Sequence, residues 1–224
     1  MSFLDELKRQ AQDLQATKSI DQGALARNTA LAEAAATEAS RYLLELAKQL
    51  EVIRPVSKTS YAFDHKTRLE GLTMLEFRFD SRRKRVREQD LTDHVSFGCV
   101  LRGTGPVVLK KNFVPEIEKL EARLWQAGIT TQGEAVRDPD SARLIEMKYE
   151  FVPEVWMSLK IVPNHDLGLL RFRLSNLDGL ETVECEFAPH LVGQRRLDEL
   201  ARWWLGHPHR FLDGAGEVRR IEAK

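Results

Sequence analysis

The densest run of chemically active side chains in this sequence is cationic. It consists of Arg82, Arg83, Lys84, Arg85 and Arg87. Clustered cations favour phosphate groups because binding releases the counterions that surround a polyanion. However, acidic residues follow at positions 88, 90 and 93, and no aromatic side chain is interleaved for base stacking. We therefore expect a solvated hairpin, with binding of a nucleic acid or a phosphate-bearing ligand as an alternative function.

The other candidate catalytic groups are scattered along the chain. His94 and Ser96 share a predicted strand, and Asp166 follows His165 in a predicted turn. A small-molecule enzyme or carrier that uses these groups on a sheet face is a second alternative. No serine stands in a Gly-x-Ser-x-Gly context, and no glycine-rich phosphate loop is present. The sequence thus predicts no catalytic residue and no cofactor, and it favours a protein that is not an enzyme.

Cysteine and histidine are not spaced as metal ligands. Cys99 and Cys185 are too few for a disulfide framework, and both fall on the apolar phase of predicted strands, where cysteine packs as a small hydrophobic residue. His207 and His209 precede Asp213, but neither a third histidine nor a second carboxylate stands close by. We expect no metal site.

The elements that must position these groups begin with a helical region over residues 1–55. Apolar residues at spacings of three and four predict an amphipathic helix there, beginning with Leu4, Leu7, Ala11 and Leu14. This rhythm breaks at residues 17–22, where Ser19 and Gln22 resemble the start of a second helix that ends before Pro55. The sequence therefore predicts either a long helical arm or an antiparallel helical hairpin.

The alanine-rich second part of this region would let a partner helix approach closely. Trp156 lies on the outward phase of a predicted strand, and adjacent helix positions such as Trp203 and Trp204 seldom both face the same core. We therefore predict an interface at Leu25, Ala35, Ala39, Tyr42, Leu46, Trp156 and Trp204.

After Pro55 the hydrophobic period changes from about 3.6 to 2, which predicts strands. Residues 56–130 and 131–213 each read as several strands followed by one helix, and in both halves a Phe-x-Pro segment leads into that helix. We expect an α+β fold in which two similar halves form one curved antiparallel sheet with helices on one face. Residues 214–224 read as a flexible tail.

Composition excludes several classes of protein. The 224 residues include 34 Lys and Arg and 34 Asp and Glu, so the net charge is zero. A dedicated nucleic-acid or membrane-surface binder usually carries a basic excess. No apolar run approaches the roughly 20 residues of a membrane span, and the N-terminus lacks the layout of a secretory signal. We expect a cytoplasmic protein that does not enter membranes.

The sequence as a whole favours a non-catalytic binding or assembly module. A long helical region with an apolar stripe is joined to a sheet without recognisable catalytic groups. We expect a homo-oligomer held together through residues 3–53, and another protein partner is compatible with the same surface.

Overall fold

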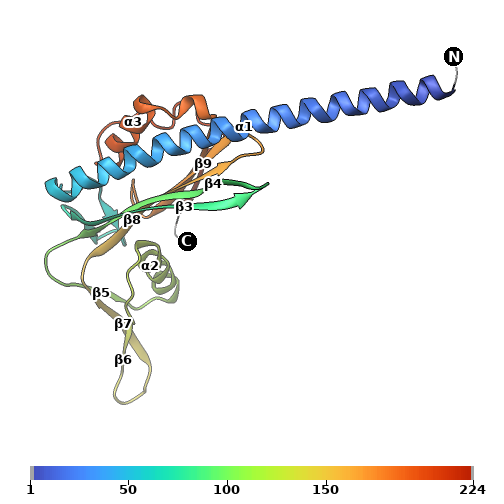
Figure 1. Cartoon of the computed structure of the whole chain (residues 1–224). Coiled ribbons are helices and arrows are strands. Elements are labelled where there is room, and N and C mark those ends of the chain that lie inside the picture. Colours follow the sequence, from blue (N-terminus) through green and yellow to red (C-terminus); the bar gives the residue numbers. More distant parts are fainter. Residues whose placement is uncertain (1–2, 223–224) are drawn as a thin grey trace.

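The computed structural model describes residues 3–222, with side chains described at residues 6–10 and from residue 21 onward. The fold is α+β, as predicted, with a long N-terminal helix lying across an antiparallel sheet (Figure 1). The elements are α1 (Phe3–Ile53), β1 (Tyr61–Ala62), β2 (Arg68–Leu69), β3 (Thr73–Val86), β4 (Gln89–Arg102), β5 (Val107–Lys111), α2 (Val114–Ala127), β6 (Glu134–Arg137), β7 (Leu144–Phe151), β8 (Glu154–Asn164), β9 (Leu169–Ser175), β10 (Glu181–Phe187), the 3-10 helix η1 (Pro189–Leu191), α3 (Gln194–Trp204) and β11 (Arg219–Glu222).

Helix α1 is one continuous helix, so the alternative of a hairpin is wrong. The predicted break at residues 17–22 contains neither glycine nor proline, and its capping signals are too weak to stop a helix. The helix ends before Arg54, which has a positive φ of 45°, and Pro55. None of the helices in the described part of the chain carries an apolar stretch long enough to span a lipid bilayer.

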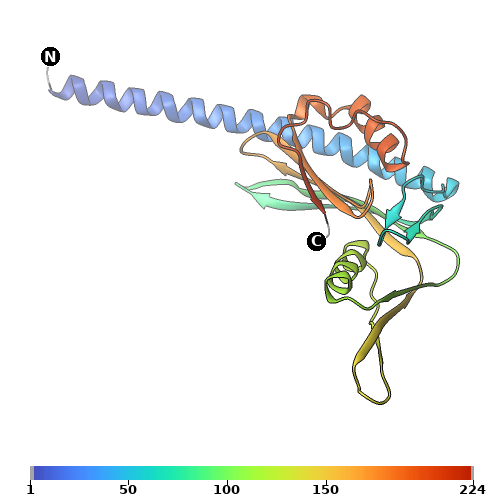
Figure 2. The ribbon, with the colours of Figure 1, turned by 180° about the vertical axis from the view of Figure 1, so that it is seen from behind.

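The C-terminal part of α1 packs on the sheet through small side chains. Ala32, Ala36, Ala39 and Leu43 are each fully buried there. The N-terminal part extends past the body of the molecule (Figures 1 and 2), and residues 6–10 and 21–23 are exposed. We call residues 3–21 the projecting segment. On its predicted apolar stripe Leu7 is 45% exposed, whereas the side chains of Leu4, Ala11 and Leu14 lie outside the described residues.

The main sheet has six antiparallel strands in the order β11-β10-β9-β8-β4-β3. Helices α1 and α3 cover one face, where the ring of Trp204 in α3 lies 4.4 Å from that of Phe97 in β4. Helix α2 lies on the other side, because a Cβ placed on Gly128 at its end would come 3.1 Å from Trp156 in β8. The expectation that helices cover a single face is therefore wrong.

The segment from β5 to β7 leaves the main sheet and forms a second sheet of three strands, in the order β5-β7-β6. This sheet packs with α2 around Leu109, Leu124 and Tyr149, all of which are buried. The segment is an insertion between β4 and β8, which pair directly with each other. The two similar halves are thus not confirmed: β3 of the first half forms an edge of the main sheet, whereas β7 of the second half is the central strand of the small sheet.

Two local features differ from the sequence-based expectation. Glu76, with a φ of 54°, lies at a bulge in β3. A bulge changes which face later residues occupy, so Leu75 no longer shares a face with Phe77 and Phe79. Within the expected tail, Arg219–Glu222 form β11 and pair with β10, because the main sheet offers an open edge there.

Candidate functional site

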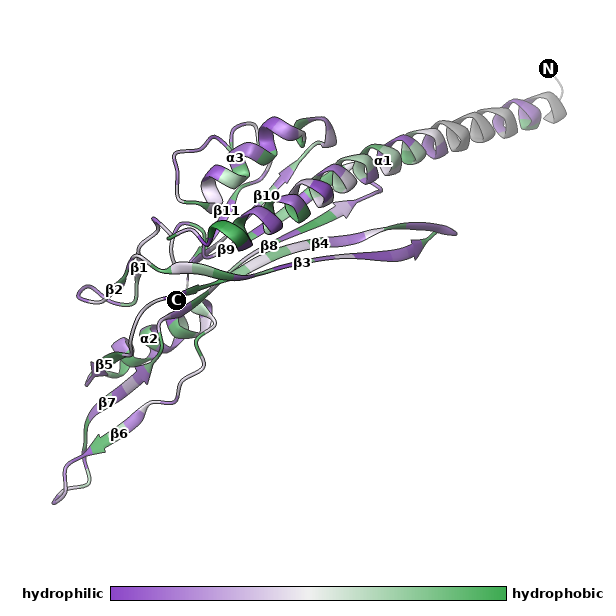
Figure 3. Cartoon of the chain, turned by 60° about the vertical axis from the view of Figure 1, so that its left-hand side comes forward, coloured by the Kyte–Doolittle hydropathy of each residue, from purple (hydrophilic) through white to green (hydrophobic). Residues whose placement is uncertain are grey.

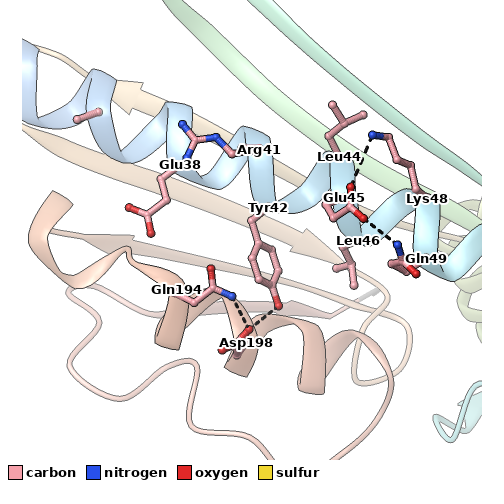
Figure 4. A pocket seen from close by; sticks show the side chains of 11 residues that line it. Glu38, Arg41, Tyr42, Leu44, Glu45, Leu46, Lys48, Gln49, Gln194 and Asp198 are labelled. Atoms are coloured by element: carbon pink, nitrogen blue, oxygen red, sulfur yellow. Dashed lines mark hydrogen bonds and ion pairs between the residues drawn. The ribbon is translucent and has the colours of Figure 1, made fainter.

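A groove of about 850 Å³ lies between α1 and α3 (Figure 4). Four charged residues of α1, at spacings of three and four, lie on its helical wall: Glu38, Arg41, Glu45 and Lys48. The remaining lining residues are Ala34, Tyr42, Leu44, Leu46, Gln49, Gln194 and Asp198.

The helical period of α1 explains this arrangement. Small residues such as Ala36 and Ala39 face the sheet and are fully buried. Residues on the opposite side of the same turns, such as Glu38 and Glu45, must therefore point outward. The groove thus combines an outward charged row with apolar side chains, including Leu44, which is 42% exposed.

A hydrogen-bonded bridge connects the two walls. The Tyr42 hydroxyl donates to Asp198 Oδ1 at 2.9 Å, and the Gln194 amide donates to the same oxygen at 3.1 Å (Figure 4). Partial burial, together with the neighbouring carboxylate, raises the pKa of the Tyr42 hydroxyl above its ordinary value of 10. The phenol therefore stays protonated and holds α3 against α1.

The predicted interface residues of α1 fall into two groups. Ala35 and Ala39 are 5% and 0% exposed because they pack in the chain's own core, so this structure leaves them no surface for a partner. Tyr42 and Leu46 are half-buried and line the groove. Leu25 is half-buried in a smaller cleft between α1 and the β3–β4 hairpin. The surface open to a partner is therefore on the side of α1 opposite to the alanine stripe.

The two aromatic residues of the predicted interface, Trp156 and Trp204, make contacts within the chain. Trp204 is 1% exposed and packs on Phe97, and Trp203 is equally buried, so both rings belong to the core. Trp156 is half-buried on the α2 side of the sheet, and the Arg78 guanidinium lies 5.4 Å from its ring centre. Trp204 therefore has no surface to offer a partner, and Arg78 and the end of α2 cover part of Trp156.

The cationic run lies at the tip of the β3–β4 hairpin, in the strongly hydrophilic part of β3 (Figure 3). Its charges are paired within the chain: Arg82 with Asp80 at 2.9 Å, Arg83 with Asp90 at 2.8 Å, Lys84 with Asp93 at 3.0 Å, and Arg87 with Asp166. Arg85 is exposed. Because neighbouring carboxylates offset most of these charges, the hairpin is a weak candidate for binding a polyanion.

A polar cluster fixes the same hairpin to α1. The Glu33 carboxylate accepts hydrogen bonds from the Thr92 hydroxyl at 2.8 Å and the Thr92 amide at 2.9 Å. It also lies 3.2 Å from His165 Nε2 and 3.4 Å from the Arg83 guanidinium. Burial raises the pKa of Glu33, but these hydrogen bonds and charges lower it more, so its net pKa is below the ordinary value of 4.5. The cluster thus ties the β3–β4 hairpin to the part of α1 that lies on the body.

The groups considered for catalysis lie on two separate elements, β4 and the turn after β8. His94 and Ser96 alternate with the buried Val95, and His94 pairs with Asp93 at 2.7 Å. Asp166 lies in the turn after β8, and its main-chain oxygen accepts a bond from Asn28 of α1. The buried cysteines are free, and burial raises the pKa of Cys99 and Cys185 to about 12. In the described residues, no group of three or more His, Cys, Asp or Glu side chains could hold a metal ion.

Sequence reasoning missed Gln194 and Asp198, which form the second wall of the groove. Asp198 is separated from its partner Tyr42 by 156 positions in the sequence, and no local pattern marks this contact. The charged row on α1 is visible as a helical period, but nothing in the sequence places α3 beside it.

Comparisons with known proteins carry no further information about this fold or groove. Neither the models of known protein families, nor the curated proteins, nor the solved structures contain a match to this chain.

Proposed function

We propose that this chain is a non-catalytic binding and assembly module, and that it forms a homo-oligomer through the projecting segment of α1. The observation that carries this proposal is that α1 continues as one helix well past the body (Figures 1 and 2). Most helical stability in proteins comes from tertiary packing of an apolar face, so a helix that extends without such packing is weakly stabilised. A second copy supplies that packing.

The sequence of the projecting segment supports the same proposal. Its leucines and Ala11 keep the spacing of three and four that is typical of paired helices. The described stripe residue, Leu7, is exposed, as expected for a contact that a second chain completes. We place the protein in the cytoplasm as part of this proposal, since its two cysteines are free thiols.

The test is the molar mass of the full chain over a range of concentrations, measured by light scattering. We expect a dimer or larger species for the natural chain and a shift toward the monomer for Leu7→Gln, because a buried glutamine amide would lack a partner. The control is Lys8→Gln, an adjacent exposed position off the stripe. Circular dichroism checks that both variants keep their helix content.

A natural chain that is monomeric at all concentrations contradicts the proposal, as does equal association of the Leu7 and Lys8 variants. Deletion of residues 1–54 is not suitable, because it removes Leu43 and Leu50 from the core. Point changes in the projecting segment leave that core intact.

A further inference from the structure

We infer that the body of this chain pairs with the body of a second copy through an antiparallel contact between their α1 helices. The contact surface is a row on the outward side of α1, which we call the outward stripe: Ala34, Glu38, Arg41, Glu45, Lys48 and Val52. It lies on a different part of α1 from the projecting segment. The inference therefore goes beyond the proposed function and does not rest on it.

The outward stripe faces away from the sheet. Its members alternate at spacings of four and three, so they lie along one side of the helix. Ala36, Ala39 and Leu43 lie on the opposite side and are fully buried. Glu38 is half-buried, and the other members of the stripe are exposed. The stripe is therefore open to a partner along its length.

The charges of the outward stripe complement themselves. In chain order they are Glu38, Arg41, Glu45 and Lys48, so their signs alternate. A two-fold axis at the level of Leu43 places Glu38 opposite Lys48 of the second copy, and Arg41 opposite its Glu45. The symmetry repeats both pairs. Every charge of the stripe then faces a charge of the opposite sign.

The apolar ends of the stripe match in the same register. Ala34 comes opposite Val52 of the second copy, and Val52 is 83% exposed. Large apolar side chains flank both ends: Leu31 is 55% exposed and Ile53 is 65% exposed. The antiparallel register brings these two exposed groups next to each other, which removes apolar surface from water.

A parallel pairing fits the same stripe less well. In register, each charge would face its own copy. A shift by one step of the stripe would pair three opposite charges, but Ala34 would then face Glu38, and Val52 would face Lys48. The shift would also leave one end of each stripe uncovered, so the contact would not close as a dimer. The antiparallel register pairs the whole stripe and closes on itself.

The intrachain contacts of the stripe offer little resistance to this pairing. The ion pair of Glu45 and Lys48 is 3.6 Å long, and both side chains are about 60% exposed. The Gln49 amide also donates to Glu45, at 2.7 Å. Exposed pairs of this kind contribute little to stability, so these side chains can turn toward a partner at low cost.

The test uses the Leu7→Gln variant as its background. Antiparallel bodies send their projecting segments in opposite directions, so the natural chain forms larger species through both contacts. The Leu7→Gln change weakens the contact of the projecting segment and leaves the outward stripe intact. We expect this variant to be a dimer, whose dissociation constant is measured by analytical ultracentrifugation.

In this background we expect Glu45→Arg and Arg41→Glu each to raise the dissociation constant by about tenfold or more. Each change sets like charges together at two symmetric places in the dimer. The control is Glu118→Arg, an exposed reversal on α2 that leaves the constant unchanged.

The combination of Arg41→Glu with Glu45→Arg distinguishes the two orientations. In the antiparallel contact, opposite charges still face each other, so the constant returns to within about threefold of the background value. In a shifted parallel contact the same exchange would set like charges together at two of the three pairs. A further rise of the constant in this variant would overturn the antiparallel register.

Disulfide cross-linking provides a readout that does not depend on affinity. We expect Ala34→Cys combined with Val52→Cys to form a covalent dimer on oxidation. Either change alone leaves the chains unlinked, because the two copies of one position lie about 27 Å apart along the helices. The natural Cys99 and Cys185 are buried and do not interfere. Failure of the double variant to cross-link would also overturn the register.

The outcomes separate this inference from the proposed function. A Leu7→Gln variant that is monomeric at all concentrations overturns the stripe contact, as does a dimer that is insensitive to the charge reversals. Neither result contradicts association through the projecting segment, which fails when Leu7→Gln leaves the molar mass of the natural chain unchanged. A natural chain that is always monomeric overturns both.

Discussion

At the scale of single residues, Glu33 is the clearest example of a polar side chain with a structural task. It lies on α1, and its carboxylate bonds to both the amide and the hydroxyl of Thr92 on β4. His165 and Arg83 come from two further places in the sequence and meet the same carboxylate. One charged group therefore holds the helix, the β3–β4 hairpin and the β8–β9 turn together.

We expect Glu33→Gln to lower the free energy of unfolding by about 1–3 kcal/mol at pH 7, because hydrogen bonds to a charged acceptor are lost or weakened. The folded-state pKa of Glu33 lies below its ordinary value of 4.5. The ionised group therefore stabilises the fold above that pH, and this contribution disappears as the pH falls through the folded pKa. Urea denaturation at pH 7 and at about pH 3 measures the difference.

The matched control is Glu118→Gln, an exposed carboxylate on α2, which should leave stability unchanged at both pH values. If the Glu33 and Glu118 variants were equally stable at pH 7, the polar cluster around Glu33 would not contribute to stability.

At the scale of elements, the packing of α3 against α1 creates the groove. Helix α3 buries Leu197, Leu200, Trp203 and Trp204 toward the sheet. Its outward residue Asp198 then meets Tyr42 of α1. This hydrogen bond is a direct contact across the groove (Figure 4).

We expect Tyr42→Phe to lower the free energy of unfolding by about 0.5–1.5 kcal/mol, the net value of one hydrogen bond. Because the pKa of Tyr42 is raised in the folded state, the natural chain also loses this contribution as the pH rises above 10, where the unfolded tyrosine ionises. A double-mutant cycle with Asp198→Ala measures the coupling. Strictly additive effects would show that the bridge is not energetically coupled.

At the scale of the whole molecule, charge is balanced locally as well as in total. The net charge is zero, and the hairpin cations face carboxylates on their own or neighbouring strands. Steering of a polyanion requires a sustained field of one sign. The paired arrangement suits a structural hairpin better than a nucleic-acid surface.

We therefore expect a variant in which Arg82, Lys84 and Arg85 are replaced by alanine to elute from heparin at the same salt concentration as the natural chain. A second triple-alanine variant, at Lys66, Arg68 and Lys119, removes the same number of exposed cations elsewhere and serves as the control. Earlier elution of the hairpin variant alone would instead support phosphate binding.

The hydrophobic periods of the sequence by themselves determined the type of many secondary-structure elements and which of their residues are buried. The change of period near Pro55, the buried phase of Val95 and Cys99, and the helix that Gly128 ends could all be predicted, because each depends on neighbouring residues within a few turns. The bulge at Glu76 was not visible, since one inserted residue changes the phase without changing the composition.

Only the tertiary structure decided which surfaces remain free. The alanine stripe of α1 predicts a close partner, but it cannot say whether that partner is a second chain or the chain's own sheet, because both bury the same apolar side chains. The sheet occupies it, and the groove then depends on Tyr42 meeting Asp198. Such contacts are set by how the packed elements meet in space, and local sequence carries no record of that.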